Sequence, residues 1–248
     1  MLRRLLVVLV VLACAAGVIG YQATRPPRAP ANPRMFVPSP QFFTDFSPSF
    51  RTSIADAYYL MMVQYYGEHV NGDGRLDSLP ALTQLVTSLS PRFTRAYLFS
   101  AFALVDAERP DVGYALLQRG LKANPDDWRF PAYLGFFAYR YGAGKDKDLV
   151  AARWYQLAAS IPGSPSYLPR LAAVLAARGG DQEKAVLMWG QAYLAGDKYV
   201  RKRAVNELNG ILPTDKAARM RAVAPLYQTM PKAEADALVG ELFKGYVQ

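Results

Sequence analysis

The sequence predicts an all-α protein, namely a solenoid of about four to five helical hairpins with a capping helix, behind one N-terminal transmembrane helix. Three observations predict this fold class. After residue 50, apolar residues recur at intervals of three and four, and no stretch alternates with period two. A pattern of small and large residues returns after 34 residues. The first 21 residues contain a continuous apolar run.

Residues 1–21 are predicted to be a transmembrane anchor or a signal segment. Residues 5–20 are uncharged and almost wholly apolar. As a helix they would span about 24 Å, slightly less than the roughly 30 Å hydrocarbon core. A cleaved secretory signal is one alternative, and a lipoprotein signal is another, because residues 11–14 resemble a lipobox ending at Cys14. We favour a retained anchor, since the apolar run continues past both cleavage points.

The orientation of the segment follows from its short N-terminal tail. Basic residues flank it on both sides, with Arg3 and Arg4 before it and Arg25, Arg28 and Arg34 after it, so the positive-inside rule nearly balances. A very short tail ahead of a first span usually stays in the cytoplasm. We therefore expect a single-pass protein of the cell inner membrane, with its C-terminal domain on the periplasmic side.

Residues 22–50 are predicted to be a proline-rich linker or strap. Seven prolines lie between residues 25 and 48, a density that forbids helix and favours an extended spacer. The same stretch contains the phenylalanines 36, 42, 43, 46 and 50, which a solvated stalk would not need. We therefore expect a strap that packs on the domain or on a partner, and a stiff stalk is the alternative.

Helices are predicted wherever the apolar period runs between proline, glycine or acidic breaks. The expected ranges are 52–69, 77–89, 92–107, 111–123, 128–142, 147–160, 166–178, 181–195, 198–211, 214–229 and 232–246. N-caps are expected at Ser53 (with Asp56 in a short capping box), Asp181, Asp197 and Thr214.

Internal repetition organises these helices into hairpins. Two small residues flank a large one on three helices, and the second and third copies are 34 residues apart. The copies are Gly113-x3-Leu117-x2-Gly120, Ala151-x3-Tyr155-x2-Ala158 and Ala185-x3-Trp189-x2-Ala192. Their partner helices repeat a second pattern, AYLFSAF from Ala96, AYLGFFA from Ala132 and SYLPRLA from Ser166. Small side chains let two antiparallel helices approach closely, so we expect these positions to be buried.

The 34-residue period and the pair Leu134-Gly135 resemble the tetratricopeptide repeat family, in a bacterial membrane-anchored or exported form, over residues 51–196. The resemblance implies that the first helices of the hairpins line a concave groove that grips peptide segments or partner helices. It makes Arg129, Phe136, Tyr139 and Arg140 candidate groove residues. Residues 197–248 match poorly and are expected to form a degenerate repeat and C-terminal capping helices.

The residue inventory argues against catalysis. The chain contains one histidine, His69, and one cysteine. The sequence has no glycine-rich phosphate loop, HExxH motif or Gly-x-Ser-x-Gly motif. We expect a protein that is not an enzyme and that uses no cofactor.

A weak calcium-loop candidate lies between the first two predicted helices. Asn71, Asp73 and Asp77 match three ligand positions of the EF-hand loop. The match fails at both ends, because His69 replaces the opening aspartate and Pro80 stands in place of the bidentate glutamate. A flexible turn between two helices is the favoured interpretation.

Positive charge concentrates near the C-terminus. The segment from Lys198 to Lys232 contains eight basic residues and only two acidic ones, Glu207 and Asp215. Its local net charge is +6, within a chain total of +9. Lys198, Arg201 and Lys202 are expected to share one helical face, and Arg219 is expected to be exposed as well. An acidic protein partner or anionic lipid headgroups would suit this surface, and a merely solvated face is the alternative. Nucleic acid is not expected, because the sequence carries no nucleic-acid motif.

Together these features indicate a membrane-anchored scaffold or adaptor that binds partner proteins, namely subunits of an envelope membrane complex, and helps to assemble or stabilise that complex. The alternative is an exported or lipid-tethered periplasmic module that captures a peptide or another ligand.

Overall fold

The computed structural model describes residues 13–17, 20, 35–46 and 48–244 and divides the chain into two compact units, Met1–Phe36 and Val37–Gln248. In the first unit, residues 13–17 and residue 20 are helical. Most of the predicted membrane segment, including residues 1–12, 18–19 and 21, lies outside the described residues. Within the part of the chain that is described, no helix has both the length and the apolar character needed to cross a membrane.

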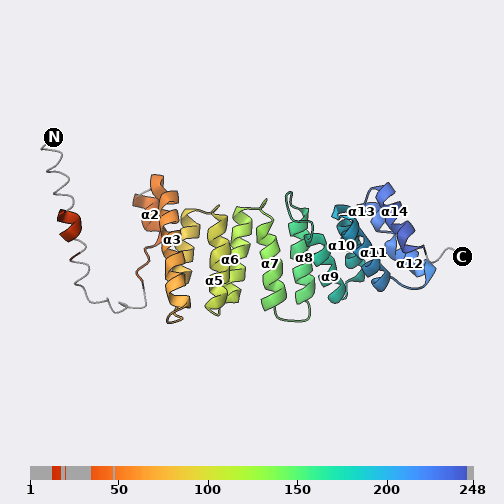
Figure 1. Cartoon of the computed structure of the whole chain (residues 1–248), viewed down its shortest axis with the longest axis horizontal. Helices are drawn as coiled ribbons and strands as arrows, with labels where there is room; N and C mark the ends of the chain where they lie inside the picture. Colours follow the sequence, from red (N-terminus) through yellow and green to blue (C-terminus); the bar gives the residue numbers. More distant parts are fainter. Residues whose placement is uncertain (1–12, 18–19, 21–34, 47, 245–248) are drawn as a thin grey trace. The chain divides into compact units, whose positions relative to one another are not determined.

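The second unit is helical throughout its described residues, without a strand (Figure 1). Its elements are α2 (Pro40–Phe46), the 3₁₀-helix η1 (Pro48–Phe50), α3 (Arg51–Val70), α4 (Leu79–Leu89), α5 (Thr94–Asp106), α6 (Pro110–Ala123), α7 (Arg129–Tyr141), α8 (Lys147–Ser160), α9 (Leu168–Arg178), α10 (Gln182–Ala195), α11 (Lys198–Ile211), α12 (Lys216–Val223), α13 (Leu226–Thr229) and α14 (Lys232–Leu242). The predicted all-α class is therefore confirmed.

Neighbouring helices in the chain are neighbours in space. From α3 to α11 each helix packs against the next, and Figure 1 shows these helices standing side by side in chain order. At the end of the row, α12, α13 and α14 pack back on α10, and α14 also contacts α11. Packing of adjacent helical pairs is the arrangement of a helical solenoid, in which each hairpin buries its open face on the next one.

Two of the predicted N-caps are confirmed and two are wrong. The carboxylates of Asp181 and Asp197 accept hydrogen bonds from backbone N–H groups at the starts of α10 and α11. Helix α3 begins at Arg51, ahead of Ser53, and has no side-chain cap. Helix α12 is capped by Asp215 instead of Thr214.

The single helix predicted over residues 214–229 is also wrong. Helix α12 ends at Val223 and the short helix α13 begins at Leu226, on the far side of Pro225. Proline has no N–H to donate and its ring clashes with the preceding turn, so it divides a helix that the apolar period alone would continue.

The proline-rich segment is partly helical, which corrects the extended conformation predicted for it. Pro40 is the first residue of α2, a position where proline costs nothing because its N–H would be unpaired there in any case. Val37 and Phe43 pack on a cluster of buried residues from α3, α4 and α5. The strap packing that we expected is therefore present at these two residues, whereas the side chain of Phe50 is 66% exposed.

The repeated small residues lie where the helices approach most closely. All nine residues of the three copies are buried. A Cβ added at Gly120 would collide with the ring of Phe130, and one at Gly113 would lie 2.7 Å from the carbonyl oxygen of Ala101. Small residues at these positions therefore set the spacing between adjacent helices, as predicted.

Candidate functional site: an aromatic pocket

The first helices of three consecutive hairpins, α5, α7 and α9, border a pocket of about 280 Å³. Six of its nine lining residues are aromatic, and none of the nine is charged. We call this set the aromatic pocket. It consists of Phe102, Trp128, Ala132, Tyr133, Phe136, Tyr155, Tyr167, Leu168 and Leu171.

Ring-to-ring contacts hold the α5 side of the pocket against α7. The ring centroid of Phe102 lies 5.3 Å from that of Tyr133 and 5.9 Å from that of Phe136. Tyr133 and Phe136 are three residues apart on α7, so helical geometry presents both on one face. Aromatic pairs at these separations stabilise their mutual arrangement by about 0.5–1.5 kcal/mol beyond the burial of their surface. The pocket wall is therefore built by packing before any partner arrives.

Tyr155 reaches the pocket from α8, a second helix, and a glycine makes this possible. A Cβ at Gly135 would lie 3.0 Å from the Tyr155 ring, which is tighter than ordinary contact. The absence of a side chain at Gly135 leaves the ring room to lie against α7. Burial, with smaller contributions from Tyr167 and Tyr139, raises the pKa of Tyr155 to about 12, so this hydroxyl keeps its proton at neutral pH.

The lining residues carry four side-chain polar groups, and each of them can donate a hydrogen bond. They are the hydroxyls of Tyr133, Tyr155 and Tyr167 and the indole Nε1–H of Trp128. No other described residue forms a hydrogen bond with any of these four groups. The pocket can therefore take an apolar or aromatic group and donate hydrogen bonds to acceptors beside it.

Comparison with known proteins gives a short result. No protein-family model matches this chain, and no curated protein matches it.

Of the four predicted groove residues, Phe136 lines the aromatic pocket and the other three do not. Arg129 is exposed at the start of α7, and its Nη2 lies 2.7 Å from Oδ2 of Asp127. Partial burial by itself raises the pKa of Asp127, but hydrogen bonds from Arg129 and Thr94 outweigh it, so the pKa lies below its ordinary value. Arg129 is therefore paired with a neighbouring carboxylate, in the loop that precedes α7.

Tyr139 and Arg140 lie toward the C-terminal end of α7. The guanidinium of Arg178 stands 5.6 Å from the Tyr139 ring centroid, and the ammonium of Lys147 stands 5.9 Å from it. Arg140 is exposed and lies over the ring of Tyr141. Tyr139 and Arg140 are therefore engaged in separate cation–aromatic contacts, and neither residue lines the pocket.

Sequence reasoning missed most of the pocket. Tyr133 and Tyr167 occupy the same place in the repeated AYLGFFA and SYLPRLA segments, so the repeat itself could have identified them. Tyr97 occupies that place in the preceding copy, but it is only 1% exposed and packs against Phe130. Trp128 and Phe102 have no such signal, because neither occupies a repeated aromatic position.

The calcium-loop candidate is arranged as a turn closed by its own hydrogen bonds. Oδ1 of Asp73 accepts a hydrogen bond from the backbone N–H of Arg75 and lies 3.1 Å from Nδ1 of His69. The Asn71 side chain donates to the carbonyl of Gly67. Across the described ranges, no three His, Cys, Asp or Glu side chains lie close enough to hold a metal ion.

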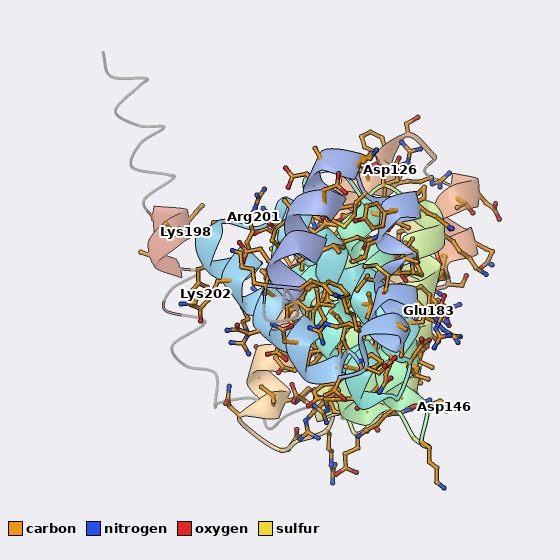
Figure 2. The ribbon with its side chains drawn as sticks, turned by 90° about the vertical axis from the view of Figure 1, so that its right-hand side faces the viewer. Asp126, Asp146, Glu183, Lys198, Arg201 and Lys202 are labelled. Carbon is orange, nitrogen blue, oxygen red and sulfur yellow. The ribbon has the colours of Figure 1, made fainter. Side chains whose placement is uncertain are left out.

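The predicted basic face is only partly free. Lys198 and Lys202 are exposed on α11. Arg201 instead lies 5.0 Å from the ring centroid of Tyr193 and 3.6 Å from a carboxylate oxygen of Glu234. Figure 2 shows Lys198, Arg201 and Lys202 on one side of the unit and three labelled acidic residues, Asp126, Asp146 and Glu183, on the other.

The expected exposure of Arg219 is wrong. Its side chain is 3% exposed and donates hydrogen bonds to the carbonyl oxygens of Pro213 and Leu242 and to Oδ1 of Asn209. Its guanidinium also lies over the ring of Phe243. Arg219 therefore joins the C-terminal helices and offers nothing to a partner.

Proposed function

We propose that this protein is a non-enzymatic, membrane-anchored scaffold of the tetratricopeptide type, which binds partner proteins and helps to assemble or stabilise an envelope membrane complex. The observation that carries the proposal is the aromatic pocket across α5, α7 and α9. Exposed aromatic side chains that already have a packed wall are the anchors that protein interfaces favour.

The tetratricopeptide assignment draws support from two independent features. The 34-residue period coincides with buried small residues at the hairpin contacts. The pocket also lies on the first helices of the hairpins, the face that such stacks use for partner segments. Tyr167, at the start of α9, is 50% exposed and is accessible to a partner.

The membrane assignment rests on the sequence. The apolar run over residues 5–20 follows Arg3 and Arg4 and precedes the helical unit by a short linker. Anchoring confines the domain to the layer in which membrane subunits lie, so a modest affinity of the pocket suffices for stable association. We place the domain on the periplasmic side of the cell inner membrane.

Purification of the full chain in mild detergent, with mass spectrometry of the proteins that co-migrate, tests this function. The wild type is compared with Tyr167→Ala and Phe136→Ala in the pocket and with Tyr199→Ala as the matched control. Tyr199 lies on α11 and is 66% exposed. Partners should be lost from both pocket variants and retained by the control. A monomer without partners, or equal recovery of partners by all four proteins, would contradict the proposal.

Phe136 is half-buried, so its removal can also weaken the fold. Thermal unfolding of each variant separates this effect from a loss of binding. Tyr167→Ala serves as the second variant, because a side chain that is half exposed contributes less to stability. Loss of partners with an unchanged melting temperature assigns the effect to the pocket.

An alkaline carbonate wash with N-terminal sequencing tests the anchor. A retained anchor keeps the protein in the membrane pellet with residues 1–20 intact. Release into the supernatant, or a new N-terminus within or after that segment, would instead support the exported or lipid-tethered binding module.

A further inference from the structure

We propose that the aromatic pocket binds a proline-rich segment of a partner protein in the extended, left-handed polyproline conformation. This inference rests on the proposed function and names the chemistry of the segment that the pocket receives. Two properties of the lining carry it, namely the density of aromatic rings and the character of its polar atoms.

The aromatic rings suit proline. Six rings from five places in the fold surround the pocket, three of them on α5 and α7 and one each from Trp128, Tyr155 and Tyr167. Flat rings pack well against pyrrolidine rings, and aromatic-lined grooves are the usual receptors of polyproline segments. Such a segment is already extended before it binds, so little conformational entropy is lost.

The polar atoms suit a polyproline backbone. That backbone forms no internal hydrogen bonds, so its carbonyl oxygens are free acceptors, and proline has no N–H that would need an acceptor. The lining residues of the pocket carry three hydroxyls and one indole N–H that can donate hydrogen bonds. Donors on the protein therefore meet acceptors on the segment.

Other occupants fit less well. An amphipathic helix pairs its own backbone groups, so it offers few free carbonyl oxygens to the donors of the lining residues. An added β-strand needs an exposed strand edge, and the pocket is bordered by helices. An acidic segment would need a cationic side chain, and none lines the pocket.

Isothermal titration calorimetry, in which a peptide is added to the full-length protein in detergent micelles, tests the inference. The probes are a capped ten-residue proline peptide, a capped Gly-Ser peptide of equal length and a capped alanine-rich helix-forming peptide. The proline peptide should bind at least about tenfold more tightly than either of the others. Equal or weaker binding of the proline peptide would overturn the inference.

Three conservative variants locate the binding. Tyr133→Phe and Tyr167→Phe each remove one donor and keep the ring, and each should weaken binding of the proline peptide about three- to tenfold. Tyr199→Phe, at an exposed position of α11 outside the pocket, should leave the binding of the proline peptide unchanged. If neither pocket variant weakens binding, the donors do not hold the segment and the inference is wrong.

The outcomes separate this inference from the proposed function. Tight binding of the helix-forming peptide, together with partner loss in Tyr167→Ala, would reject the polyproline segment and leave the scaffold function standing. Specific binding of the proline peptide, together with full partner retention in Tyr167→Ala, would support the pocket chemistry and reject the scaffold function.

Discussion

Arg219 shows how one buried cation can join several short helices. Its guanidinium donates to carbonyl oxygens after α11 and at the end of α14, and to the amide oxygen of Asn209 on α11. A buried guanidinium is tolerated only because polar groups surround it. The helices that it joins, α11, α12 and α14, share few contacts of their own, so the residue contributes to stability well beyond its size.

Arg219→Met should lower the free energy of unfolding by about 1–3 kcal/mol, because it leaves the buried carbonyl oxygen of Leu242 without this donor and removes the hydrogen bonds to Pro213 and Asn209. Chemical denaturation measures the loss. Arg221→Met on the same helix is the matched control, since Arg221 is exposed, and it should change stability by less than about 0.5 kcal/mol. If the two substitutions lowered the free energy of unfolding equally, Arg219 would not have the stabilising role described above.

Tyr155 makes the free energy of unfolding depend on pH in the alkaline range. Its pKa is about 12 in the folded protein and 10 in the unfolded chain, and burial is the main cause. The folded state therefore holds this proton more tightly, so the contribution is complete below pH 10 and is lost as the pH rises from 10 to 12.

Denaturation of the wild type should show stability falling over this range, and Tyr155→Phe should fall less steeply. The pKa of Tyr66 is also raised to about 12, through its hydrogen bond to Asp106, so part of the decline remains in the variant. Parallel curves for the two proteins would contradict the assignment.

At the scale of elements, glycines have opposite roles in different helices. Gly120 on α6 faces the ring of Phe130 with no room for a Cβ, whereas a Cβ at Gly67 on α3 would meet nothing within 4 Å. The first glycine is required by the contact between α6 and α7. The second has no packing reason, and glycine within a helix costs about 0.8–1 kcal/mol relative to alanine.

Gly120→Ala should therefore destabilise the protein by about 1–3 kcal/mol through overpacking. Gly67→Ala should stabilise it by up to about 1 kcal/mol through helix propensity. Thermal and chemical unfolding of both variants measure the difference in sign. A stabilising Gly120→Ala would mean that α6 and α7 can separate without cost, and the close approach would lose its role.

At the scale of the whole molecule, charge is unevenly distributed. The chain carries a net charge of +9, and Lys198 and Lys202 lie on the opposite side of the unit from Asp126, Asp146 and Glu183 (Figure 2). Arg201 pairs with Glu234 and Arg219 is buried, so Lys198 and Lys202 are the exposed members of the four basic residues named as a candidate surface. These two lysines are therefore the ones to test for contact with an acidic partner or an anionic membrane.

The double variant Lys198→Glu, Lys202→Glu should leave the melting temperature nearly unchanged, because exposed charges contribute little to stability. If this surface takes part in association, the double variant should bind vesicles with anionic lipid, or an acidic partner, more weakly than the wild type does when both are measured at low salt. The wild type should lose the same binding at 1 M salt, where the Debye length is about 3 Å. Equal binding by both proteins at low salt would leave the two lysines as a solvated face.

The positions of the helices could be predicted because they depend on local pattern. Residues 147–160 and 198–211 were expected to be helical with the bounds that the structure has, and Ala151 and Ala185 were expected at close contacts. Both predictions use periods and side-chain volumes that neighbouring residues carry. The same local reasoning could have predicted the break at Pro225, because proline interrupts a helix. The predicted cap of α12 is wrong by one residue, since Asp215 and not Thr214 caps the helix.

The candidate site was only partly predictable, because its residues belong to different helices. Phe136 was identified from its place on a first helix, but Phe102, Tyr155 and Tyr167 join it only when α5, α8 and α9 are rotated and packed about α7. Small errors in rotation exchange a buried face for an exposed one, as happened with Arg219.

The sequence by itself determined the all-helical class, the hairpin period and the small residues at the contacts, since each follows from interactions between residues close along the chain. The tertiary structure alone decided which aromatic rings share a pocket and which basic residues face solvent. Those outcomes depend on how whole helices are rotated against one another, and that rotation is the result of packing many side chains at once.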